Sequence, residues 1–194
     1  TRNVAVSPDG RHVAVANYLP NSLVLLDGDL NLIKTIPALD QQGKRSSRVS
    51  AVYDATPRNS FVVALKDVPE VWEISYDEKA EEIPVGLIHD FRMREGTFVP
   101  GYLNARRTLL QDPLDDFFFT QSYAELMGAS RDGVGQVVNL DVRRKIADLP
   151  LDGMPHLGSG ITWEWNGRTV MASTNLKAAE VTVIDLESWE VIKR

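Results

Sequence analysis

Short apolar runs alternate with clusters of turn-forming residues along the whole chain. The runs VAV (4–6), HVAVAN (12–17) and LVLLD (23–27) are separated by segments that contain the Pro, Asp, Asn and Gly that favour turns. Runs of this length are typical of β-strands joined as hairpins, and the nearly continuous apolar character of HVAVAN predicts a strand buried on both faces. The pattern therefore predicts an all-β protein.

The strand pattern repeats four times. A strand-turn-strand unit is clearest at VAVSPDGRHVAVAN and again at GITWEWNGRTVMAST, and each unit is followed by a run that ends in aspartate. The aspartates recur at intervals of about 50 residues, which is typical of propeller blades with four strands each. They are Asp27, Asp77, Asp141 and Asp185. We therefore predict a β-propeller of about four four-stranded blades, with approximate boundaries at residues 1–46, 47–92, 93–152 and 153–194.

One segment departs from the repeat. Residues 97–131 form a long irregular insertion in the third unit, and the stretch DPLDDFFFTQSYAELMGA predicts a short helix with the DD pair near its start. Two interpretations of its FFF run stay open. The usual burial of apolar side chains favours packing against the blades, and the alternative is a lid over a ligand.

Composition narrows the classes of function. The chain has 194 residues, 43% of them hydrophobic, and a net charge of −6 with scattered basic residues, which argues against a nucleic-acid partner. There is no cysteine, so disulfides, thiolate nucleophiles and covalent c-type haem attachment are excluded for this chain. The sequence shows no apolar run long enough to cross a membrane and no signal segment. Its ends fall inside strand patterns, as expected of a fragment of a longer protein.

Two histidines are the candidate reactive groups. His89 in LIHD follows the outer strand of the second unit, and His156 in MPHLGSG follows that of the third, so they occupy equivalent places in consecutive repeats. Because such a segment runs toward the propeller axis, the two imidazoles are expected to converge on one ligand at the channel mouth. A single histidine beside a strand is more often structural. Gly158 and Gly160 have two possible roles: they would let a flat ligand approach the backbone closely, or they would allow the chain to bend.

Other reaction chemistries find no support in the motifs. The sequence contains no HxH, HExxH or GxSxG motif and no phosphate-binding loop, so a zinc hydrolase and a serine hydrolase are not predicted. The GVG at residues 133–135 lacks the later glycine and the βαβ setting of a dinucleotide site. No metal-ligand set is predicted.

Several strings together resemble a known family. LIHD after an outer strand, GSG after MPH, and SRVSAVYDATPRNSFVVALKDVPEVWEISY resemble the haem d1-binding propeller of the cytochrome cd1 nitrite reductase family, and look most similar to its dihydro-haem d1 dehydrogenase branch. The resemblance covers nearly the whole chain except about residues 97–131. It implies an eight-bladed ring of which this chain is about half, haem d1 or its dihydro precursor as the ligand, and a periplasmic location.

The resemblance also implies residue roles. His89 and His156 match the two histidines on the distal face of the haem, and Arg48 in SRVSAV matches an arginine that pairs with the acidic side chains of the macrocycle. The proximal iron ligand and the c-type cytochrome domain of the family have no counterpart in this chain. Ser159 stands where the reductases have an arginine, and this difference argues against nitrite reduction as the activity.

Three functions therefore stay open. The first is an oxidoreductase of the dihydro-haem d1 dehydrogenase or nitrite reductase type, working with a redox partner or c-type cytochrome domain. The second is a non-catalytic haem d1 carrier, and the third is a propeller that serves only as a protein-interaction platform. We also expect the open blade faces of a half ring to favour self-association.

Overall fold

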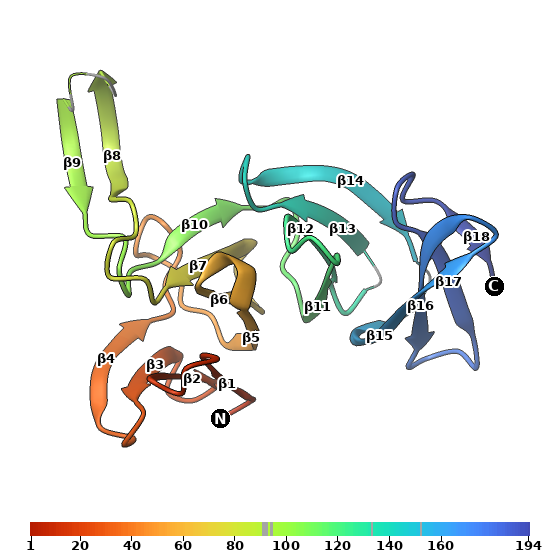
Figure 1. The fold of residues 1–194 in the computed structure, drawn as a ribbon, viewed down its shortest axis with the longest axis horizontal. Coiled ribbons are helices and arrows are strands. Elements are labelled where there is room, and N and C mark those ends of the chain that lie inside the picture. Colours follow the sequence, from red (N-terminus) through yellow and green to blue (C-terminus); the bar gives the residue numbers. More distant parts are fainter. Residues whose placement is uncertain (91–92, 94, 133, 152) are drawn as a thin grey trace.

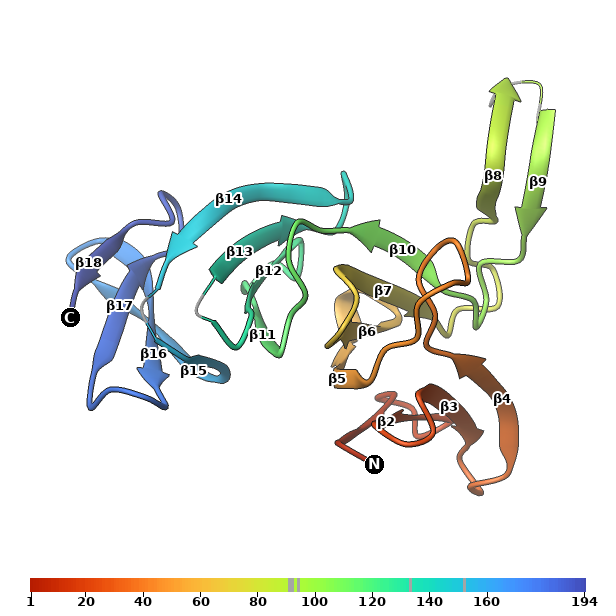
Figure 2. The same cartoon turned by 180° about the vertical axis from the view of Figure 1, so that it is seen from behind.

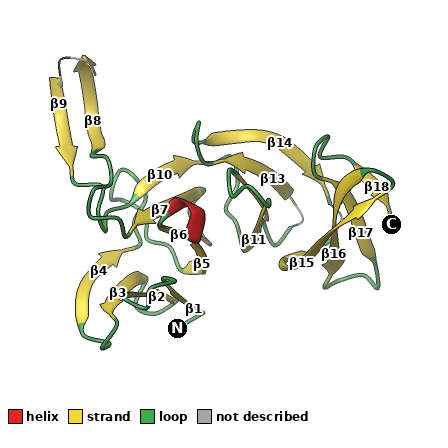
Figure 3. Ribbon diagram, viewed as in Figure 1, coloured by secondary structure: helices red, strands yellow, loops and turns green. Residues whose placement is uncertain are grey.

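A computed structural model describes residues 1–90, 93, 95–132, 134–151 and 153–194 of the chain. Four four-stranded antiparallel sheets follow one another along an arc, which Figure 1 shows face-on and Figure 2 shows from behind. The only helix among the described residues is the single turn η1 (Thr56–Arg58), drawn in red in Figure 3. The predicted all-β class with four four-stranded blades is confirmed.

The first and fourth sheets have the simple order of a blade, with each strand paired to the next along the chain. The first contains β1 (Val4–Val6), β2 (His12–Asn17), β3 (Ser22–Asp27) and β4 (Leu32–Pro37). The fourth contains β15 (Pro155–Trp165), β16 (Arg168–Asn175), β17 (Val181–Asp185) and β18 (Val191–Lys193). Their turns are the ones that the Pro, Asp and Gly residues predict.

The second sheet contains the insertion. Its strands are β5 (Val49–Ala55), β6 (Ser60–Leu65), β7 (Glu70–Ser75) and β10 (Arg106–Leu109). Between β7 and β10 the chain leaves the sheet as the hairpin of β8 (Ile83–Asp90) and β9 (Glu95–Val99), which pair only with each other. The hairpin projects from the outer side of the arc in both views (Figures 1 and 2).

The expected position of the insertion is therefore corrected. The extra residues lie in the β8–β9 hairpin rather than at 97–131, and a boundary between residues 92 and 93 cuts this hairpin. β10 closes the second blade across the insertion because Arg107 pairs in register with Trp72 and its guanidinium lies 4.6 Å from the centre of the Trp72 ring. Glu70 Oε2 accepts a hydrogen bond from Arg107 at 2.6 Å, which fixes the same contact.

The third sheet contradicts the predicted helix. It consists of β11 (Asp116–Phe119), β12 (Glu125–Ala129), β13 (Val134–Asn139) and β14 (Arg144–Pro150). DFFF forms its innermost strand, and Phe117 pairs with Gly128 of β12. Phe117 and Phe119 point to one face of the strand, with ring centres 5.4 Å apart, and Phe118 points to the other, because side chains alternate along a strand.

The hydrophobic core lies between the blades. One buried cluster joins the first two sheets around Phe61 and Trp72, a second joins sheets two and three around Leu114 and Phe117, and a third joins sheets three and four. Every residue of β6 is buried, which is why its sequence SFVVAL is apolar without alternation. The innermost strands β1, β5, β11 and β15 lie on the concave side of the arc (Figure 1).

Two further sequence-based expectations concern surfaces. Among the described residues no helix is long and apolar enough to cross a membrane. Ile161 of β15 is 65% exposed, and Val4 and Val6 of β1 are about half exposed, so apolar side chains are uncovered at both ends of the arc. Self-association through these faces stays a prediction.

Candidate functional site

β15 carries His156 on the concave side of the arc. Between the pairs His156–Thr174 and Ile161–Ala172, β15 has four residues where β16 has one, so the LGSG segment forms a large β-bulge. The glycines permit this bulge, and Leu157 anchors it because its side chain is completely buried. The His156 side chain is 37% exposed, so the imidazole is accessible to solvent.

Asp116 is the partner that the fold brings to His156. Its carboxylate Oδ2 lies 3.7 Å from His156 Nε2, within ion-pair distance, and β11 packs directly against β15. Asp116 is only 8% exposed. Its Oδ1 accepts hydrogen bonds from the Tyr53 hydroxyl at 2.7 Å and from the Phe117 amide at 2.9 Å, which fix the carboxylate in place. Burial, together with the hydrogen bond to Asp116, raises the pKa of the Tyr53 phenol above its ordinary value.

The two candidate glycines are both sites of close approach. A Cβ on Gly158 would lie 2.2 Å from Asp116 Oδ2, so only glycine lets the bulge pass over the Asp116 carboxylate. A Cβ on Gly160 would lie 2.2 Å from the terminal methyl of Met171. In both cases the approaching group is a side chain of this protein, and contact with a flat ligand stays a prediction.

An aromatic cavity of about 470 Å³ adjoins this polar group. Three innermost strands contribute to its wall: Tyr53 comes from β5, Phe117 from β11, and Gly158 from the bulge of β15. The volume lies in the range typical of small-molecule sites, and an apolar wall with a few polar groups is their usual composition. The other lining residues are Phe118, Phe119, Thr120, Gln121, Tyr123 and Thr162.

Arg48 lies at the same end of the innermost strands, directly before β5. Asp67 holds it in a bidentate ion pair: Arg48 Nε donates to Asp67 Oδ2 at 2.9 Å, and Arg48 Nη2 donates to Oδ1 at 2.5 Å. The hydrogen bond to Asp67 raises the pKa of Arg48. The guanidinium also lies 5.5 Å from the centre of the Tyr18 ring. The side chain is 42% exposed, so Arg48 is positioned by Asp67 while remaining open to solvent.

Lys66 and Asp115 complete a charged group around Arg48. A cavity of about 230 Å³ is lined by Arg48, Lys66, Asp115 and Arg131, among others. Lys66 pairs with Asp115, and Arg131 Nε lies 3.4 Å from Asp115 Oδ2. Burial lowers the pKa of Lys66 to about 8, and the positive charges of Arg131 and Arg48 lower it further. The cavity therefore combines three basic side chains with three carboxylates, those of Asp112, Asp115 and Asp132.

The adjacent aspartates of β11 connect the two parts of the site. Asp115 faces the basic cavity and Asp116 faces His156, as consecutive residues entering a strand do. Sequence reasoning placed this DD pair in a helix and so missed Asp116 and Tyr53. The feature of the sequence that could have identified Asp116 is its position. It begins the innermost strand of its blade, and His156 stands near the start of the innermost strand of the next blade.

The two candidate histidines do not occupy equivalent places. His156 lies in an innermost strand, whereas the backbone of His89 lies one residue before the end of β8, in the hairpin that projects from the outer side of the arc (Figure 1). The argument from matching repeat positions is therefore wrong. The side chain of His89 falls outside the described part of the structure, and its role at the haem stays a prediction from resemblance.

Comparison with known proteins identifies close relatives. The chain is 48% identical over 195 residues to dihydro-heme d1 dehydrogenase of Pseudomonas aeruginosa, which covers all of this chain and 35% of that protein. It is 29% identical over 204 residues to protein NirF of the same organism, covering 96% of this chain and 45% of NirF. The chain therefore spans about a third to a half of the length of these relatives.

Solved structures give the same picture. Dihydro-heme d1 dehydrogenase NirN in complex with DHE superposes with a TM-score of 0.83 at 47% identity, over all of this chain and 37% of that one. Hydrazine synthase of Kuenenia stuttgartiensis superposes with a TM-score of 0.60 at 12% identity, over 98% of this chain and 47% of that one, which shows a shared fold alone. The family model of the cytochrome D1 heme domain matches residues 1–194. The chain therefore belongs to the cytochrome D1 heme domain family.

Proposed function

We propose that this chain supplies part of the substrate site of a dihydro-haem d1 dehydrogenase. The observation that carries the proposal is that an aromatic cavity, the Asp116–His156 pair and three basic side chains lie on or beside the innermost strands β5, β11 and β15. The 48% identity to dihydro-heme d1 dehydrogenase supports the same assignment. The further assignment of a nitrite reductase activity has no comparable support.

The residues present fit a flat macrocycle with acidic substituents. The wall formed by Tyr53, Phe117 and Phe119 offers ring faces and edges to an apolar plane. Arg48, Lys66 and Arg131 lie close enough for their charges to act on one another, and a carboxylate placed among them would relieve that repulsion. The side chains of Arg48 and Arg131 are 42% and 60% exposed, so both guanidinium groups are open to such a carboxylate.

His156 is positioned to handle a proton. Dehydrogenation of the bound substrate removes two electrons and two protons, and the electrons leave to a redox partner. The His156 side chain is partly exposed and its Nε2 lies 3.7 Å from a fixed carboxylate, the arrangement typical of a general base. Asp116 attracts the imidazole when it carries a proton. Because Tyr53 and the Phe117 amide hold Asp116 in turn, the carboxylate acts as a positioning residue.

The test is to add dihydro-haem d1 to the protein with an electron acceptor and to follow the absorption spectrum. Binding and oxidation are expected in the wild type. His156→Gln is expected to keep binding, since the aromatic wall and basic cluster remain, and to slow oxidation by roughly 10² to 10⁴, the usual contribution of a general acid or base. His12→Gln is the matched control, because His12 Nε2 contacts the Tyr102 hydroxyl at 3.0 Å, outside this site.

The outcomes separate the three functions. Oxidation that His156→Gln slows and His12→Gln does not supports the dehydrogenase. Binding without oxidation in the wild type indicates a carrier. An absorption spectrum that stays unchanged on mixing excludes both and leaves the interaction platform.

A further inference from the structure

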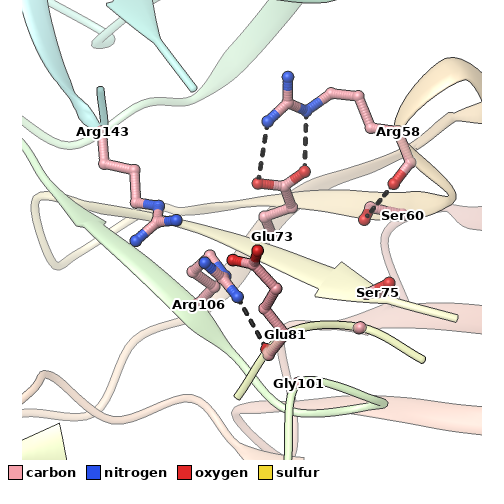
Figure 4. Close-up of a pocket in the computed structure, with 9 residues that line it drawn as sticks. Arg58, Ser60, Glu73, Ser75, Glu81, Gly101, Arg106 and Arg143 are labelled. Carbon is pink, nitrogen blue, oxygen red and sulfur yellow. Dashed lines mark hydrogen bonds and ion pairs between the residues drawn. The ribbon is translucent and has the colours of Figure 1, made fainter. Parts of the chain in front are cut away.

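A second cavity lies beyond the end of β5, and none of its lining residues lines the aromatic or the basic cavity of the proposed haem site. It has a volume of about 190 Å³ and lies between the second and third blades, at the root of the β8–β9 hairpin (Figure 4). Arg58 in its wall follows the end of β5, whereas Arg48 precedes its start, and a seven-residue strand separates the two by roughly 20 Å. The cavity is therefore distinct from the proposed haem site.

Three arginines line this cavity, and one of them is fully engaged. Arg58 Nε donates to Glu73 Oε1 at 2.8 Å, and Arg58 Nη1 donates to Asp141 Oδ1 at 2.6 Å. A longer contact of 3.4 Å joins Arg58 Nη2 to Glu73 Oε2. Both carboxylates are directed at Arg58, and in the described part of the chain no ion pair involves Arg106 or Arg143.

Arg106 and Arg143 keep unused hydrogen-bond donors. Arg106 Nη2 donates to the backbone carbonyl of Glu81 at 2.8 Å, which engages one of the five N–H donors of a guanidinium. Within the described residues, no hydrogen bond or ion pair engages the side chain of Arg143. Figure 4 shows both guanidinium groups facing the same space, into which the Glu81 side chain also points. Burial and the charge of Arg106 lower the pKa of Arg143, while the charges of Glu73 and Glu81 raise it.

The fold itself does not require arginine at position 143. In three blades a residue with left-handed backbone precedes the outer strand: Leu30 with φ 65°, Arg143 with φ 52° and Trp189 with φ 62°. In each turn an Asp or Asn side chain accepts backbone hydrogen bonds, as the Asn139 amide oxygen does from Asp141 and Val142. Leucine, arginine and tryptophan all occur at this position of the turn, so the conformation of the turn does not explain why residue 143 is an arginine.

We propose that Arg106 and Arg143 bind an oxyanion, a phosphate or carboxylate group, in this cavity. Each planar fork can donate two parallel hydrogen bonds to such a group, and the anion would neutralise two like charges that face one another. Gly101 keeps the site narrow, because a Cβ there would lie 2.1 Å from the Glu81 carbonyl that Arg106 also contacts. The hairpin root thus forms one wall and the β13–β14 turn the opposite one.

The probes for the test are inorganic phosphate and acetate, titrated into the protein against chloride at equal ionic strength. Isothermal titration is expected to show phosphate binding in the wild type. Arg143→Gln is expected to weaken it about tenfold or more, the effect of losing hydrogen bonds to a charged group. Arg144→Gln is the matched control, since Arg144 is the adjacent arginine, is exposed like Arg143 and does not line the cavity.

The two anions distinguish the source of the ligand group. Acetate binding that also depends on Arg143 indicates a carboxylate ligand, and a response to phosphate alone indicates a phosphorylated one. Equal phosphate binding by Arg143→Gln and Arg144→Gln, or no binding of either anion beyond chloride, overturns the proposal. Because His156 is remote, His156→Gln is expected to leave these titrations unchanged, so this result is independent of the haem assignment.

Discussion

Replacing Tyr53 with phenylalanine removes a single oxygen atom from the candidate site. The lost hydroxyl donates to Asp116 Oδ1 at 2.7 Å, while the ring, which packs edge-on against Phe117 at 4.9 Å, stays in place. Asp116 then keeps only the Phe117 amide as a hydrogen-bond donor to Oδ1. The substitution therefore measures how firmly the carboxylate beside His156 is held.

The magnitude follows from the burial and charge of the acceptor. A hydrogen bond to a charged group contributes about 1.5 to 3 kcal/mol, and Asp116 is 8% exposed while Tyr53 is half-buried. We expect Tyr53→Phe to lower the free energy of unfolding by about 2 kcal/mol, which corresponds to a decrease in Tm of roughly 4 to 8 °C for a chain of this size. Urea denaturation followed by tryptophan fluorescence measures the change directly.

Tyr123→Phe is the matched control. Tyr123 lines the same cavity and lies 4.9 Å from the Phe119 ring, and within the described residues its hydroxyl makes no hydrogen bond. We expect a loss under about 0.5 kcal/mol for this variant, as for substitutions that break no buried contact. A double-mutant cycle of Tyr53→Phe with Asp116→Ala isolates the pair. Equal losses in the two tyrosine variants, or a coupling below about 0.5 kcal/mol, would refute the geometry.

The same bond predicts a dependence on alkaline pH. The pKa of folded Tyr53 is raised above the ordinary value of 10.0, chiefly by burial and next by Asp116. The unfolded phenol therefore loses its proton first, and stability falls as pH rises above about 10. Tyr53→Phe is expected to reduce this alkaline loss relative to the wild type, and Tyr123→Phe is expected to leave it intact.

Three further predictions concern other parts of the chain. Glu70→Ala should lower the free energy of unfolding by about 3 to 5 kcal/mol in urea denaturation. The reason is that the Glu70 carboxylate is 2% exposed and accepts a hydrogen bond from Trp72 Nε1 at 2.9 Å. A decrease under about 1 kcal/mol contradicts this prediction. Gly101→Ala should lower Tm, since its Cβ would meet backbone oxygen at 2.1 Å, and an unchanged Tm contradicts the close approach. The pKa of Lys66 is lowered from 10.5 to about 8 in the folded state, so between pH 8 and 10 the unfolded state binds more protons and the free energy of unfolding should rise with pH. Lys66→Met should flatten this rise. An unchanged dependence of stability on pH in the variant contradicts the lowered pKa of Lys66.

Local pattern was sufficient for the strands and their turns. HVAVAN, LVLLD and VTVID are strands where their apolar residues predict them, because a blade strand is buried on both faces whichever blade it belongs to. The aspartates at the ends of β3 and β17 also have a local role, since Asp27 and Asp185 each accept backbone hydrogen bonds in the following turn. These interactions lie within a few residues and are visible in sequence.

Strand pairing across the insertion needed the tertiary structure. The strand RRTL (106–109) closes the second blade because Arg107 contacts Trp72 and Glu70 of β7. These residues are 35 or more positions apart in the chain, and the hairpin between them has a strand pattern of its own. DFFF was read as helical because a four-residue strand with three adjacent phenylalanines has no clear period. Its pairing with β12 decided the conformation.

The candidate site divides in the same way. The sequence determined that His156 stands among glycines near the start of a strand, and the resemblance supplied a ligand class. Only the tertiary structure decided that Asp116 lies beside that imidazole, because adjacent innermost strands lie side by side in space while their residues are about 40 positions apart in the chain. Such a neighbour is set by the packing of whole blades, which no short segment of sequence encodes.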